Sequence, residues 1–146
     1  MNTFKKDLEF GKKYEKIAVE YLEYDNIKFM EGRFKEYDFI IEKDNIKKYI
    51  EVKSDKLGYK TGNLAIEYES RGKPSGISAT MADFWMYFII ENNNYTCYKI
   101  PVDELKEIIK NCFSVCGGDN RTSKLYLLKI DKIKKYKVEK KCVFQN

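Results

Sequence analysis

Apolar residues recur at helical spacing near the start of the chain and at alternating spacing in the two runs that follow. The residues at helical spacing are Tyr14, Ile17, Ala18, Tyr21 and Leu22. They predict a helix over residues 5–24. The runs EYDFIIEK (36–43) and KKYIEVKS (47–54) predict two strands. Asp44 and Asn45 between them tolerate the left-handed conformation of a two-residue turn, so we expect a hairpin.

The rest of the chain alternates between further strand-like and helix-like segments. We expect strands at 27–31, 63–70, 84–90, 95–100 and 124–130, a short helical segment at 77–82 and a helix at 101–112. Glycine-containing loops are expected at 56–62, 71–76 and 116–123, and a solvated basic tail at 131–141. This order of elements predicts an α/β fold with a mixed central sheet flanked by helices.

Length and composition indicate one domain over residues 1–146, with an ordinary hydrophobic core. The longest apolar run, FWMYFII at 84–90, is far shorter than the roughly 18 to 20 residues of a membrane span. The first residues do not resemble a signal peptide, so we expect an intracellular, cytoplasmic protein with no membrane partner. In that compartment the four cysteines are expected to be thiols: Cys97, Cys112, Cys116 and Cys142. Cys112 and Cys116 could share a helix face or bind a metal, but their spacing matches no strong zinc pattern.

The chain contains no histidine. This excludes a Ser-His-Asp triad, a Cys-His pair and every nuclease that uses a histidine base. Any hydrolysis must then use carboxylates and lysines, and we expect it to use a bound metal as well. The net charge of +5, from 28 basic and 23 acidic residues, is compatible with a polyanionic partner.

The predicted hairpin places two carboxylates opposite each other. A turn at residues 44–45 pairs positions that sum to 89, so Asp38 faces Glu51, with Cβ atoms roughly 4.5 to 5.5 Å apart. Lys53 points to the same face as Glu51, because side chains alternate along a strand. A divalent cation between the acids would remove their repulsion. The opposite face is expected to form core through Tyr37, Phe39, Ile41, Ile50 and Val52. The alternative is a solvated strand face with scattered charges.

A third acid lies on the first predicted helix. Glu15 falls among the apolar residues Leu8, Gly11, Ala18 and Leu22 on a helical wheel. Buried glutamates are uncommon unless they are paired or bind a metal. The alternative is a glutamate at the edge of the apolar stripe that points outward.

Together, GKKYEKIAVEYL, DFII and IEVKS resemble the PD-(D/E)XK nuclease superfamily, which has the restriction-endonuclease-like fold. Within it they are most similar to archaeal-type and phage Holliday junction resolvases, over roughly residues 11–55. Tyr37 stands where the superfamily's name has proline. The resemblance implies a metal-dependent phosphodiesterase that uses Mg²⁺, with Mn²⁺ as a substitute. The implied metal ligands are Asp38, Glu51 and the Val52 carbonyl; Lys53 would orient water or stabilise the phosphate, and Glu15 would complete the metal site.

Other residues are weaker candidates. Glu67 and Glu69 would add ligands if their strand neighboured that of Glu51; otherwise they lie on an exposed edge face. The loops at 71–76 and 116–123 offer phosphate contacts, or are ordinary loops. Their candidate DNA-binding residues are Arg71, Lys73, Ser75, Arg121 and Lys124. We expect Trp85 to be a core residue.

These observations favour a Mg²⁺-dependent endodeoxyribonuclease that acts on DNA, in recombination or repair. The expected form is a homodimeric Holliday junction resolvase without a nucleotide cofactor. Two alternatives stay open: a restriction or repair endonuclease of the same fold, and a nucleic-acid-binding protein that keeps the fold without activity.

Overall fold

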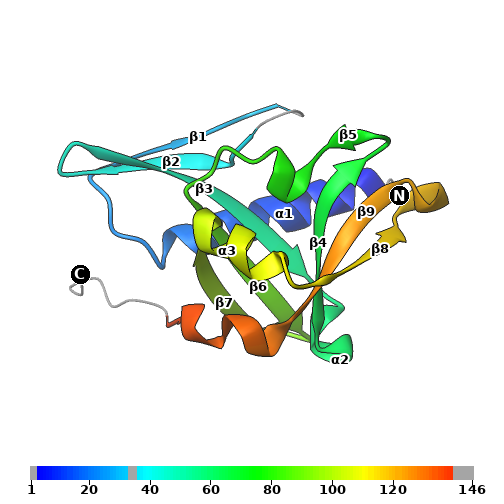
Figure 1. Cartoon of the computed structure of the whole chain (residues 1–146). Helices are drawn as coiled ribbons and strands as arrows, with labels where there is room; N and C mark the ends of the chain where they lie inside the picture. Colours follow the sequence, from blue (N-terminus) through cyan, green and yellow to red (C-terminus); the bar gives the residue numbers. More distant parts are fainter. Residues whose placement is uncertain (1–2, 33–35, 140–146) are drawn as a thin grey trace.

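The computed structural model describes residues 3–32 and 36–139, which form two β-sheets with helices packed against them (Figure 1). In spatial order, the larger sheet contains β1 (Asn26–Phe29), β2 (Phe39–Lys43), β3 (Ile46–Asp55), β6 (Phe84–Glu91), β7 (Asn94–Pro101) and β10 (Lys137–Val138). The smaller sheet contains β5 (Lys73–Pro74), β4 (Asn63–Ser70), β9 (Ser123–Lys129) and β8 (Phe113–Gly117). The α-helices are α1 (Thr3–Val19), α2 (Gly58–Thr61) and α3 (Val102–Ile109), and the 3₁₀ turns are η1 (Gly76–Ser78), η2 (Asp119–Arg121) and η3 (Ile130–Tyr136). None of the helices in the described ranges has the length and apolar character to cross a membrane.

The larger sheet is mixed, which confirms the predicted fold class. β3 and β6 run parallel, whereas the other pairings in the described part of this sheet are antiparallel. A parallel pair requires a long crossover. Here the crossover between β3 and β6 contains α2, β4, β5 and η1, so it supplies two strands of the smaller sheet.

The larger sheet separates two hydrophobic clusters. On one face, Tyr14 and Ala18 of α1 pack against Phe39, Ile50 and Phe88. The other cluster joins the opposite face to the smaller sheet and α3, so that α1 and α3 lie on opposite sides of β3 and β6 (Figure 1). Its largest members include Trp85, Leu64, Ile66, Leu105 and Leu128. The prediction that Trp85 is a core residue is confirmed.

The hairpin has the predicted turn and register. Asp44 and Asn45 have φ values of 52° and 66°, so both adopt the left-handed conformation. The pairs run from Lys43–Ile46 to Phe39–Ile50, each summing to 89. The ladder ends there, because the backbone N–H of Asp38 donates to the Ile50 carbonyl instead of pairing with Glu51.

The chain's departure from the ladder at Asp38 also moves Tyr37. Tyr37 was expected in the core beside Phe39, and this prediction is wrong. Its ring makes an edge contact with Tyr49, with centroids 4.8 Å apart, and it packs against the cluster of the opposite face. Alternation holds only while a residue remains in the strand.

Several predicted boundaries also differ from the structure. α1 ends at Val19 rather than residue 24, and the segment expected to be helical at 77–82 contains only the 3₁₀ turn η1. The strand β8 was not predicted. Residues 131–139 are not a solvated tail, because Ile133 is fully buried and β10 pairs with β7. Ile130, Ile133 and Tyr136 recur every third residue, which places them on one side of a 3₁₀ helix.

The cysteines agree with the expectation of thiols as far as they are described. Cys97 is buried, Cys112 half-buried and Cys116 exposed, and all three are free. Cys112 follows α3 and Cys116 lies in β8, so they do not share a helix face. Cys142 lies outside the described residues.

The first prediction concerns the close packing of the 71–76 loop. Gly76 has φ +50°, and a Cβ atom there would collide with the Glu67 carbonyl oxygen. Gly72 also has positive φ (+80°), but open space surrounds its Cβ position. We expect Gly72→Ala to cost about 1–2 kcal/mol of unfolding free energy from the backbone alone. Gly76→Ala should cost about 2–4 kcal/mol, because overpacking adds to that strain.

Urea unfolding monitored by circular dichroism measures both changes, with Gly72→Ala as the matched control. Equal losses in the two variants would show that Gly76 does not approach the Glu67 backbone.

Candidate active site

Asp38, Glu51 and Lys53 lie close to one another around β3. Glu51 and Lys53 are two residues apart on this strand, and Asp38 immediately precedes the neighbouring β2. Asp38 is 8% exposed as a residue, whereas the side chains of Glu51 and Lys53 are 14% and 37% exposed. Charged groups at this depth are costly unless they are paired.

Both oxygens of the Glu51 carboxylate have partners. Oε1 accepts a hydrogen bond from the Thr80 hydroxyl at 2.8 Å, and Oε2 forms an ion pair with the Lys53 ammonium at 2.7 Å. The same ammonium lies 4.9 Å from the centroid of the Trp85 ring. These contacts hold the carboxylate and the lysine in defined positions.

Thr80 is the centre of this network, although the sequence analysis did not single it out. Its hydroxyl accepts hydrogen bonds from the Trp85 indole N–H and the Ala82 backbone N–H, both at 3.2 Å, while donating to Glu51. Thr80 lies in the loop before β6, 29 residues after Glu51. No local sequence pattern indicates such a contact.

Asp38 is bound to the backbone of the neighbouring strand. Its Oδ2 accepts a hydrogen bond from the Val52 N–H at 2.6 Å. Its own N–H donates to Ile50 and its carbonyl accepts from Met30. The carboxylate therefore takes the place of a backbone carbonyl acceptor at the point where β2 begins. It lies beside Val52, whose carbonyl is a predicted metal ligand.

Asp55 is a third acid on the face of Glu51 and Lys53, and the sequence analysis did not single it out. Its Oδ1 accepts hydrogen bonds from the N–H groups of Leu57 and Gly58, at 2.7 and 2.8 Å. Its Oδ2 accepts from the Tyr87 hydroxyl at 3.4 Å. Burial, with the charge of Asp55 beside it, raises the pKa of Tyr87 above its ordinary value, so the phenol stays protonated. Asp55 thus stabilises the start of α2.

The donor set around Asp38 and Glu51 fits a magnesium ion that shares its coordination with substrate. In the described part of the chain, no group of three or more acidic, thiol or imidazole side chains could enclose a metal. Mg²⁺ does not need such a cage: it is commonly held by one or two carboxylates, with waters and phosphate oxygens completing its shell. Two carboxylates and the Val52 carbonyl are hard oxygen donors of this kind.

Glu15 is half-buried on α1. That helix packs on the face of Phe39 and Ile50, whereas Glu51 contacts Thr80 on the opposite face. The buried side of α1 is centred on Tyr14 and Ala18, and Leu8 is exposed rather than part of it. A role for Glu15 in the metal site stays a prediction.

The strand carrying Glu67 and Glu69 does not neighbour that of Glu51. β4 belongs to the smaller sheet, between β5 and β9. A bulge lies between Glu67 and Glu69, and the Glu69 carboxylate pairs with the Lys124 ammonium at 3.3 Å. The expectation of added ligands from β4 loses its geometric basis.

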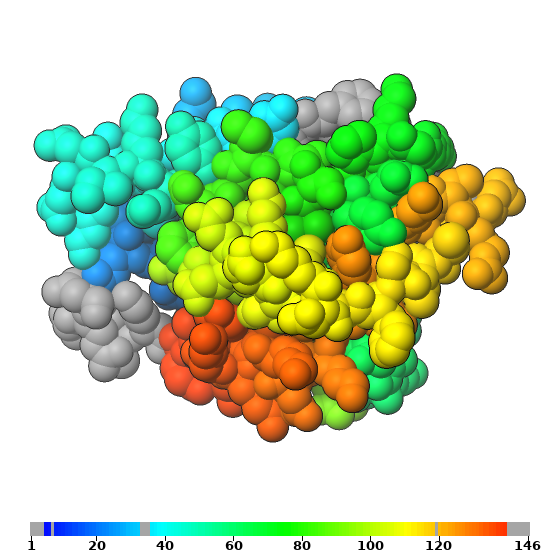
Figure 2. Space-filling view, in the orientation of Figure 1, coloured from blue at the N-terminus to red at the C-terminus, as the bar shows by residue number. Residues whose placement is uncertain are grey.

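The two loops with candidate phosphate-binding residues meet at one end of the smaller sheet. The Arg71 N–H donates to the Thr122 carbonyl at 2.9 Å. Figure 2 shows the green 71–76 region next to the orange region around residue 120. Arg71, Lys73, Arg121 and Lys124 are all exposed, so the fold gathers four basic side chains from distant parts of the chain. Ser75 differs, because its hydroxyl is buried and has no hydrogen-bond partner among the described residues.

The chain has a distant structural likeness to a known protein. No family model matches the chain. No curated protein matches it either. A solved structure of a bacterial homing endonuclease, I-Ssp6803I, aligns with a TM-score of 0.47 and 18% identity, over 87% of this chain and 81% of that one. A likeness this distant assigns no activity, and the functional proposal rests on the residues of the site.

The second prediction concerns Thr80. Thr80→Val keeps the shape of the side chain but removes the donor to Glu51 and the acceptor for Trp85 and Ala82. We expect a loss of about 1–3 kcal/mol in unfolding free energy, because buried polar groups lose their partners. Thr96→Val on β7, two strands from Glu51, is the matched control for chemical denaturation. A Thr80→Val variant as stable as Thr96→Val would contradict the network.

Proposed function

We propose that this protein is a metal-dependent DNA endonuclease. The observation that carries the proposal is the Glu51 carboxylate, held between the Thr80 hydroxyl and the Lys53 ammonium beside the buried Asp38. Two carboxylates that hold a metal ion, with a lysine beside them, would hydrolyse a phosphodiester without histidine. The resemblance of the hairpin to PD-(D/E)XK nucleases supports the same assignment.

Each residue would have a distinct task. Asp38, Glu51 and the Val52 carbonyl would hold Mg²⁺, which activates water and neutralises phosphate charge. The Val52 N–H fixes the orientation of Asp38, and Thr80 fixes that of Glu51. Lys53 is the most exposed of the three charged groups, so its ammonium can leave Glu51 and stabilise the phosphate.

The basic residues at the end of the smaller sheet would hold the DNA backbone. Arg71, Lys73, Arg121 and Lys124 lie on two adjoining loops, and phosphate contacts position a duplex without reading its sequence. Lys124 is partly neutralised by Glu69, so we expect it to contribute least.

Within this class we favour a homodimeric enzyme that resolves four-way junctions. The support is the similarity of residues 11–55 to junction resolvases. A restriction or repair endonuclease would use the same residues on another DNA substrate. A non-catalytic nucleic-acid-binding protein would keep the basic loops and show no cleavage.

The third prediction is that cleavage requires Mg²⁺ or Mn²⁺ and all three charged residues. Asp38→Asn and Glu51→Gln should abolish cleavage of plasmid and branched DNA, because each removes a metal ligand. Both should stay folded, since an amide oxygen can still accept the hydrogen bond from Val52 or Thr80, and both should retain DNA binding, because each removes negative charge near the phosphate. Glu42→Gln on the same hairpin is the matched control. Undiminished cleavage in EDTA would overturn the metal-dependent mechanism.

The same assay tests Lys53. Lys53→Met keeps the aliphatic chain beside Trp85 and should lower the cleavage rate about 10²- to 10³-fold, as expected for one electrostatic stabiliser. Lys48→Met, an exposed position of the same strand, should leave the rate unchanged. Equal rates for the two variants would remove Lys53 from the mechanism.

The fourth prediction concerns the substrate. A four-way junction should bind more tightly than linear duplex of equal length and be cleaved in preference to a flap, because a dimer presents two sites. The measurements are gel-shift titration with Glu51→Gln and Ca²⁺, cleavage by the wild type, and mass by light scattering. A monomer with equal affinity for junction and duplex would exclude the resolvase and leave the nuclease.

A further inference from the structure

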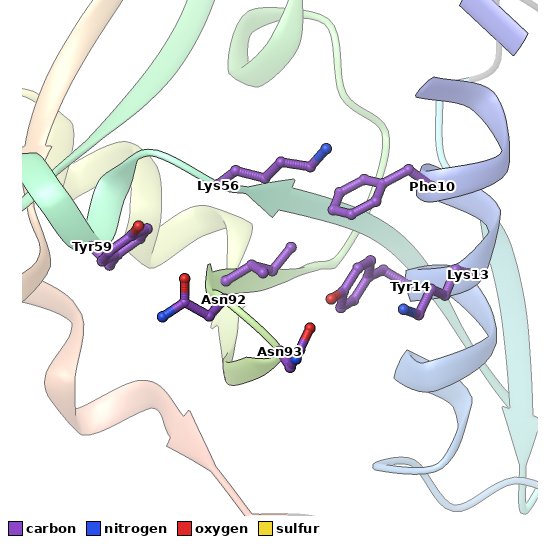
Figure 3. Close-up of a pocket in the computed structure, with 8 residues that line it drawn as sticks. Phe10, Lys13, Tyr14, Lys56, Tyr59, Asn92 and Asn93 are labelled. Carbon is purple, nitrogen blue, oxygen red and sulfur yellow. The ribbon is translucent and has the colours of Figure 1, made fainter. Parts of the chain in front are cut away.

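A cleft of 520 Å³ lies beside α1, at the end of β3 and β6 away from the hairpin turn (Figure 3). Its walls come from α1, α2, the residue after β3 and the turn between β6 and β7. The lining residues are Phe10, Lys13, Tyr14, Lys56, Tyr59, Ile90, Asn92 and Asn93. None of the functions discussed above uses this cleft.

Aromatic side chains line two sides of the cleft. Figure 3 shows Tyr59 of α2 on one side and Phe10 and Tyr14 of α1 on the other. The rings of Phe10 and Tyr14 contact each other at 5.0 Å between centroids, which makes a continuous apolar wall. Ile90 is buried in the core behind the cleft. The rings of Phe10 and Tyr59 are half-buried, so part of each can contact a flat ligand group.

The charge in the cleft has one sign. Lys13 and Lys56 line it, and no lining residue is acidic. The Lys56 ammonium lies 4.0 Å from the centroid of the Phe10 ring, and that of Lys13 lies 5.7 Å from the Tyr14 ring. Neither lysine pairs with a carboxylate within the ranges 3–32 and 36–139. A cation–π contact at an exposed site is worth only about 0.5–1 kcal/mol, so an anion can draw both ammonium groups away.

Amide groups complete the polar side of the cleft. Asn92 and Asn93 form the turn between β6 and β7, and Asn92 has φ 56°. Both side chains are exposed, and Figure 3 places Asn92 near Tyr59 and Asn93 below Tyr14. An amide offers both donors and an acceptor, which suits the edge of a nucleobase.

We propose that this cleft binds a nucleotide, with the base against the aromatic side chains and the phosphate at Lys13 and Lys56. A bare anion would bind the two lysines but would not contact the aromatic side chains. An apolar ligand would contact the aromatic side chains but would leave the charges of the lysines unneutralised. The ligand chemistry is that of a nucleoside phosphate, either free or as one unit of a single strand. Aromatic stacking and lysine contacts are the usual means of binding such a unit.

The cleft is separate from the candidate active site. Tyr14 and Ile90 belong to the cluster on the α1 face of the larger sheet, whereas Glu51 contacts Thr80 on the opposite face. Nucleotide binding therefore does not depend on the proposed endonuclease activity. It can be measured in EDTA and in the Glu51→Gln variant, where that activity is expected to be absent.

The experiment is a titration followed through the side-chain amide NMR signals of Asn92 and Asn93 in ¹⁵N-labelled protein. The probes are deoxyadenosine 5′-monophosphate, deoxyadenosine, inorganic phosphate and a short single-stranded oligodeoxyadenylate. The monophosphate should shift both amide signals and bind at least about tenfold more tightly than the nucleoside or inorganic phosphate. Its base contacts the aromatic side chains while its phosphate contacts the lysines.

Variants then divide the two parts of the cleft. Lys13→Gln with Lys56→Gln should weaken the monophosphate at least about tenfold and leave the nucleoside unchanged. Lys16→Gln with Lys48→Gln is the matched control, because both lysines are exposed and the net charge changes equally. Tyr59→Leu should weaken both the nucleoside and the monophosphate, and circular dichroism checks that it is folded.

The outcomes separate the possibilities. Monophosphate binding that depends on Lys13, Lys56 and Tyr59 supports the site. If the oligonucleotide competes with the monophosphate through the same residues, the natural ligand is a nucleic acid strand. If it does not compete, the natural ligand is a free nucleotide. Inorganic phosphate binding as tightly as the monophosphate would overturn the nucleotide assignment. So would the absence of shifts at millimolar concentrations, or equal losses in the test and control lysine variants.

Discussion

β3 is hydrogen-bonded on both edges, and the rest of the larger sheet depends on this constraint. β2 pairs with it in antiparallel orientation and β6 in parallel orientation, so the strand cannot shift without breaking two ladders. Its side chains are divided between two faces that are both covered. Ile50 and Val52 face the α1 core, and Glu51 and Lys53 face the side of Trp85. The second half of the strand, which is partly buried, thereby carries a pair of charges in a fixed place.

The cost of burying these charges is offset by specific partners. Asp38 is satisfied by the Val52 N–H, and Glu51 by Thr80 and Lys53. Removing one partner from such a network costs more unfolding free energy than the intact network contributes. The reason is that the remaining group stays buried without a partner or water. The partners of Glu51 are also exchangeable, because an ammonium and a hydroxyl can give way to a cation. In the proposed mechanism, the network would hold the ligands in position for a metal and a phosphate.

Two groups of basic residues lie on separate surfaces. Four exposed basic residues gather where β4 ends and β5 and β9 begin, and two lysines line the aromatic cleft beside α1. The former come from loops that meet through the Arg71 and Thr122 backbones, and the latter from α1 and the end of β3. The first arrangement is a set of exposed charges, whereas the second combines charge with aromatic and amide side chains. We expect the first to tolerate many DNA sequences and the second to accept one nucleotide unit.

Local sequence determined the hairpin almost completely. Apolar and polar residues alternate along both strands, and two residues that accept positive φ lie between them. Together these features set the turn and the register, and therefore the side of the sheet that Glu51 and Lys53 share. The sequence did not show that the ladder ends at Phe39, because the Asp38 carboxylate replaces a backbone acceptor there. It also did not show the partners that come from distant segments. Thr80 reaches Glu51 only because the long crossover returns the chain to a parallel strand beside β3, and Ile133 is buried only because β10 closes the sheet against β7. The periodicity of the sequence indicates which side of a helix or strand is apolar. Packing over the whole chain decides which other element covers that side.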